Sequence, residues 1–309
     1  PKVSVALTTY NQRGFIAQAI DSVLMQETNF EYRLIIGEDD SSDGTREIVK
    51  AYKENHPDKI KLFLNNRDNV IYIDGKPTGR WNFVNNIKHA RGQYIALLEG
   101  DDYWTNSEKL QKQADFLDQH PNCTICFHAV ERRYEEEDKI CPSSHTLTEV
   151  IYTIEDLLQK NFIATCSVMF RNGLFDEFPD WYYTVPMGDW PLHILNAQYG
   201  DIGYIDRAMA VYRIHRGGIR SLRNKRYKLE VNVSTLKIIR PHLDSKYHYA
   251  IDQDIARRHL KIVRALIQEK GLKALCPYLS DLVRDKTVSN RALAQVASAV
   301  LIRKLGVKT

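Results

Sequence analysis

The chain has 309 residues, of which 43% are hydrophobic and 27% charged, and this composition excludes a disordered or fibrous protein. No apolar run reaches the length of about 18 residues that a membrane-spanning helix needs, and residues 1–7 lack the basic and apolar regions of a secretory leader. Five cysteines are few for a chain of this size, so we expect a reducing, cytoplasmic compartment. Cys123 and Cys126 form a C-x-x-C pair with no second pair, which predicts core residues rather than a zinc site.

Charge is divided unevenly along the chain. The formal net charge is +4, yet the residues from Arg216 to Thr309 carry 21 Lys and Arg against 7 Asp and Glu. The preceding residues, 1–215, carry 22 Lys and Arg against 32 Asp and Glu. An acidic body is therefore joined to a basic tail, and we expect the two parts to meet different partners.

The apolar pattern predicts secondary structure in chain order. Val3, Val5 and Leu7 alternate with smaller or more polar residues and indicate a strand, which is followed by helical spacing over 15–24. We then expect a strand at 32–36, a turn at 41–44, a helix at 45–52, a strand at 60–64, a helix at 83–90, a strand at 94–98, a helix at 109–120 and a strand at 124–130. Short connections between alternating strands and helices predict parallel βαβ units in an α/β fold.

The remaining third of the chain is expected to be mainly helical. Pro191 stands in the first turn of a predicted helix, and residues 208–211 indicate one more strand. After about residue 223 the strand signals end, and we expect helices with breaks near Pro241, Gly271 and Pro277.

Polar residues follow three of the predicted strands. In open α/β sheets, ligands bind beyond the carboxyl ends of the strands, so the informative segments are 8–11, 38–40 and 99–102. Glu99, Asp101 and Asp102 crowd one such end, and crowded carboxylates favour a divalent cation that bridges substrate phosphates. The alternative is a solvated loop that caps the next helix. No glycine-rich phosphate loop follows the first strand, which argues against a dinucleotide dehydrogenase and a P-loop NTPase.

Three motifs in order then resemble family 2 glycosyltransferases with the GT-A fold. They are the first strand and turn at 3–11, the second-strand motif at 38–45, and the strand at 92–102 that leads into a metal-binding acidic motif with Glu99 where many members have Asp. The resemblance covers residues 2 to about 221. It implies a Rossmann-like GT-A nucleotide-sugar-binding domain at 1–221, of the type found in bacterial surface polysaccharide biosynthesis, and a basic, mainly helical C-terminal region at 222–309.

The resemblance implies a role for each matching residue. Tyr10 would stack on the base of a nucleotide sugar near Thr8, and Asp40 would accept a hydrogen bond from the base. Arg80 would contact the nucleotide. Asp102 would bind the metal, Mn²⁺ or Mg²⁺, with Asp101 beside it on the nucleotide. Tyr10 as a turn aromatic stays open, whereas Asp39 and Asp43 are expected to be helix caps or turn formers.

Two further positions complete the implied site. Asp189 resembles the general base of inverting members, and its place at a helix start suits an ionised carboxylate or a simple cap. His215 would complete the metal or diphosphate shell. Three arginines close to it would clamp phosphate oxygens, with at least one expected to face solvent instead: Arg213, Arg216 and Arg220.

These expectations define an inverting, metal-dependent glycosyltransferase. Asp189 would deprotonate a hydroxyl of a glycan or lipid-linked acceptor, which displaces the diphosphate of a nucleotide-sugar donor, and we expect this donor to be a UDP-sugar. The alternatives are a sugar-phosphate nucleotidyltransferase, which usually carries a glycine-rich basic loop where this chain has residues 9–14, and a nucleic-acid-binding protein. The tail's few tyrosines show no stacking pattern, so no nucleic acid partner is expected.

The sequence leaves the sugar, the acceptor and the oligomeric state open, including a homo-oligomer. Several aromatic residues fit either a sugar site or the core: Trp104, Trp181, Tyr182, Tyr183 and Trp190. The final segment, 290–305, has an uncharged apolar stretch at 292–302 flanked by basic residues. This pattern predicts either peripheral binding to an anionic membrane at the inner face of the plasma membrane, or packing on the protein.

Overall fold

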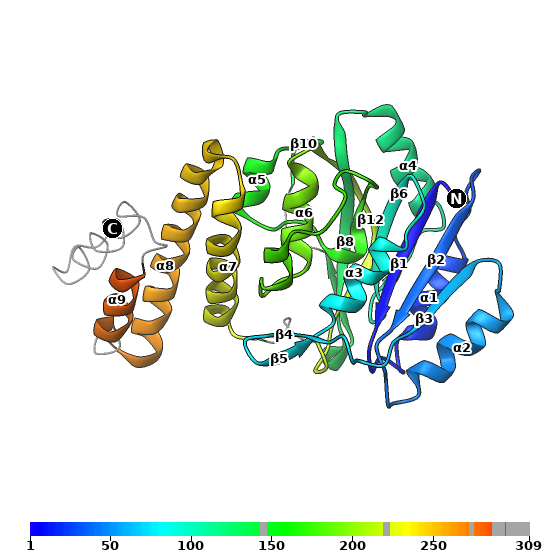
Figure 1. Ribbon diagram of the computed structural model, residues 1–309, viewed down its shortest axis with the longest axis horizontal. Helices are drawn as coiled ribbons and strands as arrows, with labels where there is room; N and C mark the ends of the chain where they lie inside the picture. Colours follow the sequence, from blue (N-terminus) through cyan, green and yellow to red (C-terminus); the bar gives the residue numbers. More distant parts are fainter. Residues whose placement is uncertain (143–146, 219–222, 272–274, 286–293, 295–309) are drawn as a thin grey trace. The chain divides into compact units, whose positions relative to one another are not determined.

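The computed structural model describes residues 1–142, 147–218, 223–271, 275–285 and 294 (Figure 1). The chain divides into two compact units, one made of residues 1–157, 161–183 and 188–218, the other of 158–160, 184–187 and 219–309. The domain boundary predicted between residues 221 and 222 falls outside the described residues and stays a prediction.

The first unit is built on one mixed sheet (Figure 1). Over the described residues its strands lie in the order β10-β12-β8-β11-β6-β1-β2-β3, with β7 paired to β12 and β9 paired to β8. The strands are β1 (Val3–Thr9), β2 (Tyr32–Glu38), β3 (Ile60–Leu64), β6 (Tyr94–Glu99), β7 (Tyr103–Trp104), β8 (Cys123–Tyr134), β9 (Lys139–Pro142), β10 (Ile151–Tyr152), β11 (Met169–Arg171) and β12 (Asp201–Ile214). A separate hairpin pairs β4 (Ile71–Ile73) with β5 (Lys76–Thr78).

Helices cover both faces of this sheet. They are α1 (Ile16–Leu24), α2 (Thr45–Asn55), α3 (Arg80–Lys88), α4 (Lys109–Gln119) and α6 (Asp189–Ala197); α5 (Ile154–Gln159) spans both units. Buried residues of α1, α2 and α4 join alternate residues of β1, Val3, Val5 and Leu7, in one hydrophobic cluster, because alternate strand residues point to the same face. Helix α3 packs on the opposite face at Gly37, where a Cβ atom would lie 2.0 Å from Oδ1 of Asn82.

The prediction of parallel βαβ units is confirmed for the first half of the sheet. Strands β1, β2, β3 and β6 are mutually parallel. It is wrong for β11, which is antiparallel to both β6 and β8. The strand predicted at 208–211 is the end of the longer β12, which runs parallel to β8 and shifts register between Ile205 and Ala210. Beyond the shift, Ala210 and Val211 also pair with β7, so the end of β12 approaches the segment after β6.

Most of the large aromatic candidates belong to the core. Trp104, Tyr182 and Trp190 are fully buried, which confirms core packing for these three. Trp181 and Tyr183 are partly exposed, so their assignment stays open. Cys123 and Cys126 are buried in the core, as expected.

The second unit contains α7 (Lys225–Ile239), α8 (His248–Lys270) and α9 (Leu275–Arg284). Breaks occur as predicted near Pro241 and at Gly271, which adopts a φ of 72° beyond the end of α8. The break predicted at Pro277 is wrong, because Pro277 lies in the first turn of α9, where a missing N–H costs no helical hydrogen bond. The described helices include none with the length and apolarity needed to cross a bilayer. Apart from Ala294, the predicted apolar stretch 292–302 lies outside the described residues.

Candidate active site

The candidate site lies where β1, β2 and β6 end. In the register of these parallel strands, Thr8 lies beside Glu99 and Thr9 lies beside Glu38. The three segments that the sequence analysis singled out therefore meet at one edge of the sheet, where α/β folds place their ligands.

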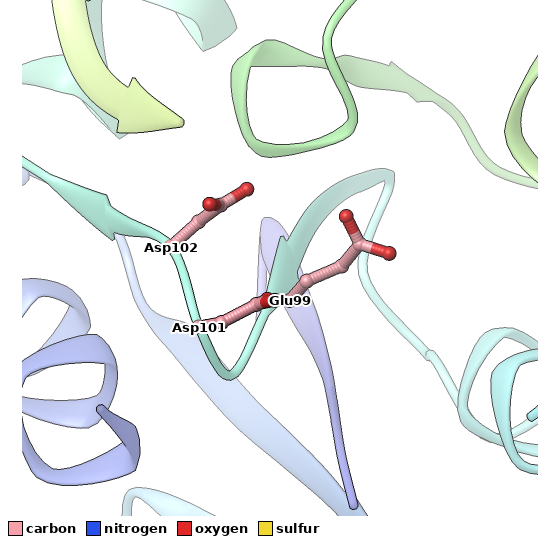
Figure 2. A group of neighbouring side chains, drawn as sticks. All are labelled: Glu99, Asp101 and Asp102. Atoms are coloured by element: carbon pink, nitrogen blue, oxygen red, sulfur yellow. The ribbon is translucent and has the colours of Figure 1, made fainter. Parts of the chain in front are cut away.

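Glu99, Asp101 and Asp102 surround the bend that follows β6 (Figure 2). Each offers a carboxylate oxygen within 4.8 Å of the others. Gly100 permits the tight bend, because a Cβ atom at this position would lie 2.5 Å from Oε1 of Gln12. Three carboxylates at these separations repel one another unless a cation or a proton intervenes, so the bend is suited to a divalent cation with oxygen ligands.

Asp102 is the buried member of the group, with 1% of its surface exposed. Its Oδ1 accepts the backbone N–H of Arg213 at 2.8 Å, which ties the bend to β12. Its Oδ2 is enclosed and accepts no N–H or O–H hydrogen bond from the described residues. Burial and repulsion from Asp101 and Glu99 raise the pKa of Asp102 well above its ordinary value.

Asp101 is joined to His215, which follows β12. Nε2 of His215 lies 3.0 Å from Oδ2 of Asp101, and both side chains are partly exposed. The hydrogen bond to Asp101 raises the pKa of His215. The structure thus brings His215 to the acidic bend, as the sequence predicted, and its direct partner there is Asp101.

The carboxylate of Glu99 is affected by the charges of both Asp101 and Asp189. Burial raises the pKa of Glu99 to about 8, and the charges of Asp101 and Asp189 act in the same direction. Tyr212 of β12 is affected by the same carboxylates. Burial, together with their charges, raises the pKa of its hydroxyl. Sequence reasoning passed over Tyr212, whose only signal was its place shortly before His215 in the chain.

Arg213, one of the three arginines predicted to clamp phosphate oxygens, is 6% exposed and contacts several segments of the protein. Its Nη1 donates to the backbone carbonyl of Asp101 at 2.6 Å. The rest of the guanidinium contacts residues from other segments, namely Gln18, Glu135, Phe15 and Tyr103. Arg213 therefore braces the acidic bend, and its predicted contact with phosphate stays a prediction.

The other two arginines differ from Arg213. The side chain of Arg216 is 87% exposed, and its Nε lies 3.8 Å from Glu136, as expected for one solvent-facing arginine. Arg220 lies outside the described residues. Whether either contacts phosphate stays a prediction.

Asp189 is the first residue of α6, as expected for either a base or a cap. Nδ2 of Asn161 donates to its Oδ2 at 3.1 Å. The carboxylate lies in the electrostatic environment of Arg80 and Glu99. The charge of Asp189 therefore acts on Glu99 of the acidic bend, although the two residues are about 90 residues apart in the sequence.

Arg80 begins α3 and is 5% exposed. Its guanidinium donates to the carbonyl of Tyr182 and lies 4.7 Å from the centre of the Tyr182 ring. The Tyr182 hydroxyl in turn donates to the carbonyl of Gly188 at 2.7 Å, immediately before Asp189. Arg80 is thus directed at the segment that precedes Asp189, and its predicted contact with the nucleotide stays a prediction.

A cavity of about 240 Å³ opens beside the end of β2. Its lining includes Asp39, Arg67 and Trp81. The Arg67 guanidinium lies over the half-exposed ring of Tyr10 at 4.3 Å, and its Nη1 donates to Oδ2 of Asp39 at 2.8 Å. Burial raises the pKa of Asp39 to about 6, although Arg67 opposes the shift. The lining of the cavity therefore includes the buried carboxylate of Asp39 and the side chain of Trp81, and its Arg67 is in contact with Tyr10 outside the lining.

The carboxylate in this cavity is Asp39, which the sequence analysis took for a cap or turn former. That expectation is wrong for Asp39, whose side chain bonds Arg67 instead of the backbone. It is confirmed for Asp43, which accepts the backbone N–H groups of Arg13 and Thr45. Asp40 has a φ of 65°, is half-exposed and lies 3.4 Å from Arg46. The predicted base-binding role of Asp40 stays a prediction, with Asp39 as the better placed carboxylate.

The family model for glycosyl transferase family 2 matches residues 4–178, which is more than half of the chain. The chain belongs to glycosyl transferase family 2. The matched range includes the carboxyl ends of β1, β2 and β6, so the family assignment and the geometry converge on the same edge of the sheet.

Relatives extend the comparison beyond the family model. An uncharacterized protein of Mycobacterium tuberculosis is 36% identical over 218 residues, which cover 70% of this family 2 chain and 60% of that protein. TuaG of Bacillus subtilis, provisionally named as a teichuronic acid biosynthesis glycosyltransferase, is 26% identical over 224 residues, or 72% of this chain and 82% of TuaG. The match thus spans about three-fifths of the mycobacterial relative's length.

Solved structures show the fold. S. aureus TarS 1–349 in complex with UDP-GlcNAc superposes with a TM-score of 0.65 at 18% identity, over 96% of this chain and 84% of that chain. The mannosyltransferase PcManGT from Pyrobaculum calidifontis, in complex with GDP-Man and Mn²⁺, has a TM-score of 0.54 at 16% identity, over 100% of this chain and 88% of that chain. The predicted GT-A fold with a helical C-terminal region is confirmed.

Proposed function

We propose that this family 2 chain is a metal-dependent, inverting glycosyltransferase that moves a sugar from a UDP-linked donor to a hydroxyl group of an acceptor. One observation carries the proposal. The charge of Asp189, at the start of α6, acts on Glu99 of the acidic bend, and Asp101 of the same bend contacts His215. A base and a diphosphate-binding site are the two parts that a single displacement at a sugar carbon requires.

Asp101 and His215 are the residues we propose to hold the divalent cation, Mn²⁺ or Mg²⁺, with Glu99 beside them. The donor set fits such an ion, because carboxylate oxygens and an imidazole nitrogen suit divalent manganese and related metals. Asp102, which the sequence assigned to the metal, has an enclosed carboxylate that already binds Arg213, so we propose a supporting role for it. A bound cation would stabilise the negative charge that develops on the leaving diphosphate.

The cavity beside β2 is the proposed base site. A base stacked on Tyr10 would meet the buried carboxylate of Asp39, which can accept the imide N–H of uracil. Thr8 ends β1 next to this site and next to Glu99, consistent with a place near the ribose or diphosphate. The UDP-GlcNAc complex of TarS supports a UDP-sugar as the donor. Because PcManGT was solved with GDP-Man, donors with other bases are included in the experiment below.

In the proposed reaction, Asp189 accepts the proton of the acceptor hydroxyl as its oxygen attacks the anomeric carbon. The carbon–oxygen bond to the diphosphate breaks on the opposite face, so the configuration inverts. Such a base contributes about 10²–10⁴-fold in rate. The name of TuaG, which refers to teichuronic acid biosynthesis, supports a glycan or lipid-linked glycan acceptor in surface polysaccharide biosynthesis. We also propose peripheral attachment to an anionic membrane through the basic C-terminal region.

A hydrolysis screen tests the proposal without knowledge of the acceptor. UDP-, GDP-, dTDP- and CMP-sugars are incubated with the protein and Mn²⁺, Mg²⁺ or EDTA, and the released nucleotide is measured. We expect release from a UDP-sugar that requires the cation and is lost in Asp101→Asn. Asp176→Asn, an exposed carboxylate outside the site, is the control with unchanged release. Equal release in EDTA, or none from any donor, contradicts the proposal.

A further inference from the structure

The carboxylate of Asp189 is held from the side by Asn161. Nδ2 of Asn161 donates to Oδ2 of Asp189 at 3.1 Å, across 28 residues of sequence. The same amide accepts the backbone N–H of Ile163 through Oδ1 at 3.3 Å. Because the oxygen of the amide is used by a backbone donor, its NH₂ group is the end that faces Asp189.

The segment around Asn161 is itself fixed against the core. Phe162 is 8% exposed, and its ring lies 5.4 Å from that of Phe127 and 5.1 Å from that of Tyr152. On α6, the indole N–H of Trp190, next to Asp189, donates to the carbonyl of Leu157 at 2.9 Å. Neighbouring residues of α6 therefore bind the same connecting segment, and the amide of Asn161 has little freedom to move away.

Other charged or titratable groups surround Asp189 without replacing this contact. They are Arg80, Glu99, Tyr182, His193 and Tyr212. Arg80 donates to the carbonyl of Tyr182. His193 lies one turn along α6, and burial lowers its pKa to about 4, so it brings no positive charge at neutral pH. The N–H of Asn161 is thus a fixed donor to the Asp189 carboxylate.

We propose that Asn161 is a positioning residue for the base. Its amide holds one carboxylate oxygen of Asp189 and leaves the other oxygen aimed at the acceptor hydroxyl. This inference rests on the proposed function, because it assigns Asn161 a role only if Asp189 accepts the proton. A side chain that orients a reacting group affects the reaction step more than the binding of the donor.

The kinetic test compares Asn161→Ala and Asn161→Asp with the parent protein. The donor is the nucleotide sugar with the highest rate in the hydrolysis screen, and water is the acceptor. We expect kcat to fall about 10–100-fold, the range seen when orienting partners are removed, while KM for the donor changes less than about twofold. Asn161→Asp keeps the size of the side chain but places a second carboxylate beside Asp189, so its loss should be at least as large.

A matched control separates positioning from stability. Nδ2 of Asn172 also donates side-chain hydrogen bonds, to the carbonyls of Gly92 and Ala90, and these bonds are part-buried although Asn172 itself is exposed and outside the site. Asn172→Ala should lower the melting temperature by a similar amount and leave kcat unchanged. In an Asp189→Asn background, Asn161→Ala should lower the residual rate less than about twofold, because its partner no longer acts as a base.

A stability cycle tests the contact without any turnover. Asn161→Ala and Asp189→Ala, alone and together, should show coupling of about tenfold in the unfolding equilibrium constant. Absence of coupling, or a kcat loss equal to that of Asn172→Ala, overturns the inference. If Asp189→Asn keeps full activity, the proposed function fails first and the positioning role with it. If Asp189→Asn is inactive but Asn161→Ala is not impaired, only the positioning role is wrong.

Discussion

Replacing Asp102 by Asn should stabilise the metal-free protein. The amide keeps the oxygen that accepts the N–H of Arg213. It replaces the enclosed Oδ2, which accepts no N–H or O–H hydrogen bond from the described residues, with an NH₂ donor. The three carboxylates offer oxygens within 4.8 Å of one another. Two unit charges at that separation would repel by about 3 kcal/mol at an effective dielectric constant of about 20. Loss of part of this repulsion should raise the free energy of unfolding by about 1–3 kcal/mol.

The measurement is a thermal denaturation series in EDTA at pH 7.5. At roughly 2–4 °C for each kcal/mol, Asp102→Asn should raise the melting temperature by several degrees. Asp118→Asn provides a control of opposite sign. Lys2 and Tyr94 hold Asp118, and their hydrogen bonds lower its pKa, so this variant should melt earlier.

Melting temperatures in Mn²⁺ separate the effect of charge repulsion from the effect of metal binding. Asp101→Asn should abolish the stabilisation that Mn²⁺ gives the parent protein, whereas Asp102→Asn should retain most of it. If Asp102→Asn melts below the parent in EDTA, the reasoning from charge crowding is refuted. If instead it loses the response to Mn²⁺, Asp102 is a metal ligand, as the sequence alone suggested.

Other expected results concern pH, the base, the nucleotide and the tail. Folding raises the pKa of Glu99 from 4.5 to about 8. Between these pH values the folded metal-free protein therefore holds a proton that the unfolded chain has lost. Its melting temperature should fall as the pH rises from about 5 to about 8. Mn²⁺ should weaken this dependence. Asp189→Asn should bind UDP in calorimetry as tightly as the parent but lose transfer. An unchanged kcat would exclude Asp189 as the base and leave it with a structural role at the start of the helix. Asp39→Asn should weaken UDP binding about tenfold, whereas Asp40→Asn should change it less than about twofold; the reverse order restores the original assignment. Binding to anionic vesicles at low salt should weaken when residues 288–309 are deleted, and equal co-sedimentation excludes the tail as the anchor.

The first half of the sheet could be predicted because its strands are long and regularly separated. Residues such as Val3, Val5 and Leu7 carry a clear period of two, and the helices between the strands keep the period of helices. The second half could not be predicted in this way. Strands β7 and β11 have only two and three residues, too few to show a period, and their antiparallel pairing is set by contacts distant in sequence.

The sequence was enough to predict which segments form the site, but not which side chain of each segment faces into it. Strand ends mark where polar residues gather, so Glu99 and Asp101 could be found from the sequence. The pairing of Asp101 with His215 spans 114 residues and depends on the register shift within β12. Asp39 and Asp40 are chemically alike in the sequence, and only the left-handed backbone at Asp40 separates the buried carboxylate from the exposed one.

Arg213 has a consequence for loop exchange between relatives. Its guanidinium joins Gln18 on α1, the carbonyl of Asp101, and Glu135 after β8, three segments that a transplant would treat as independent modules. If only the bend after β6 were replaced by that of another family member, the new bend would lack the residues that match Gln18 and Glu135 in its own protein. Donor-site chimeras of this chain should exchange Gln18 and Glu135 together with the bend, as one spatial module rather than one stretch of sequence.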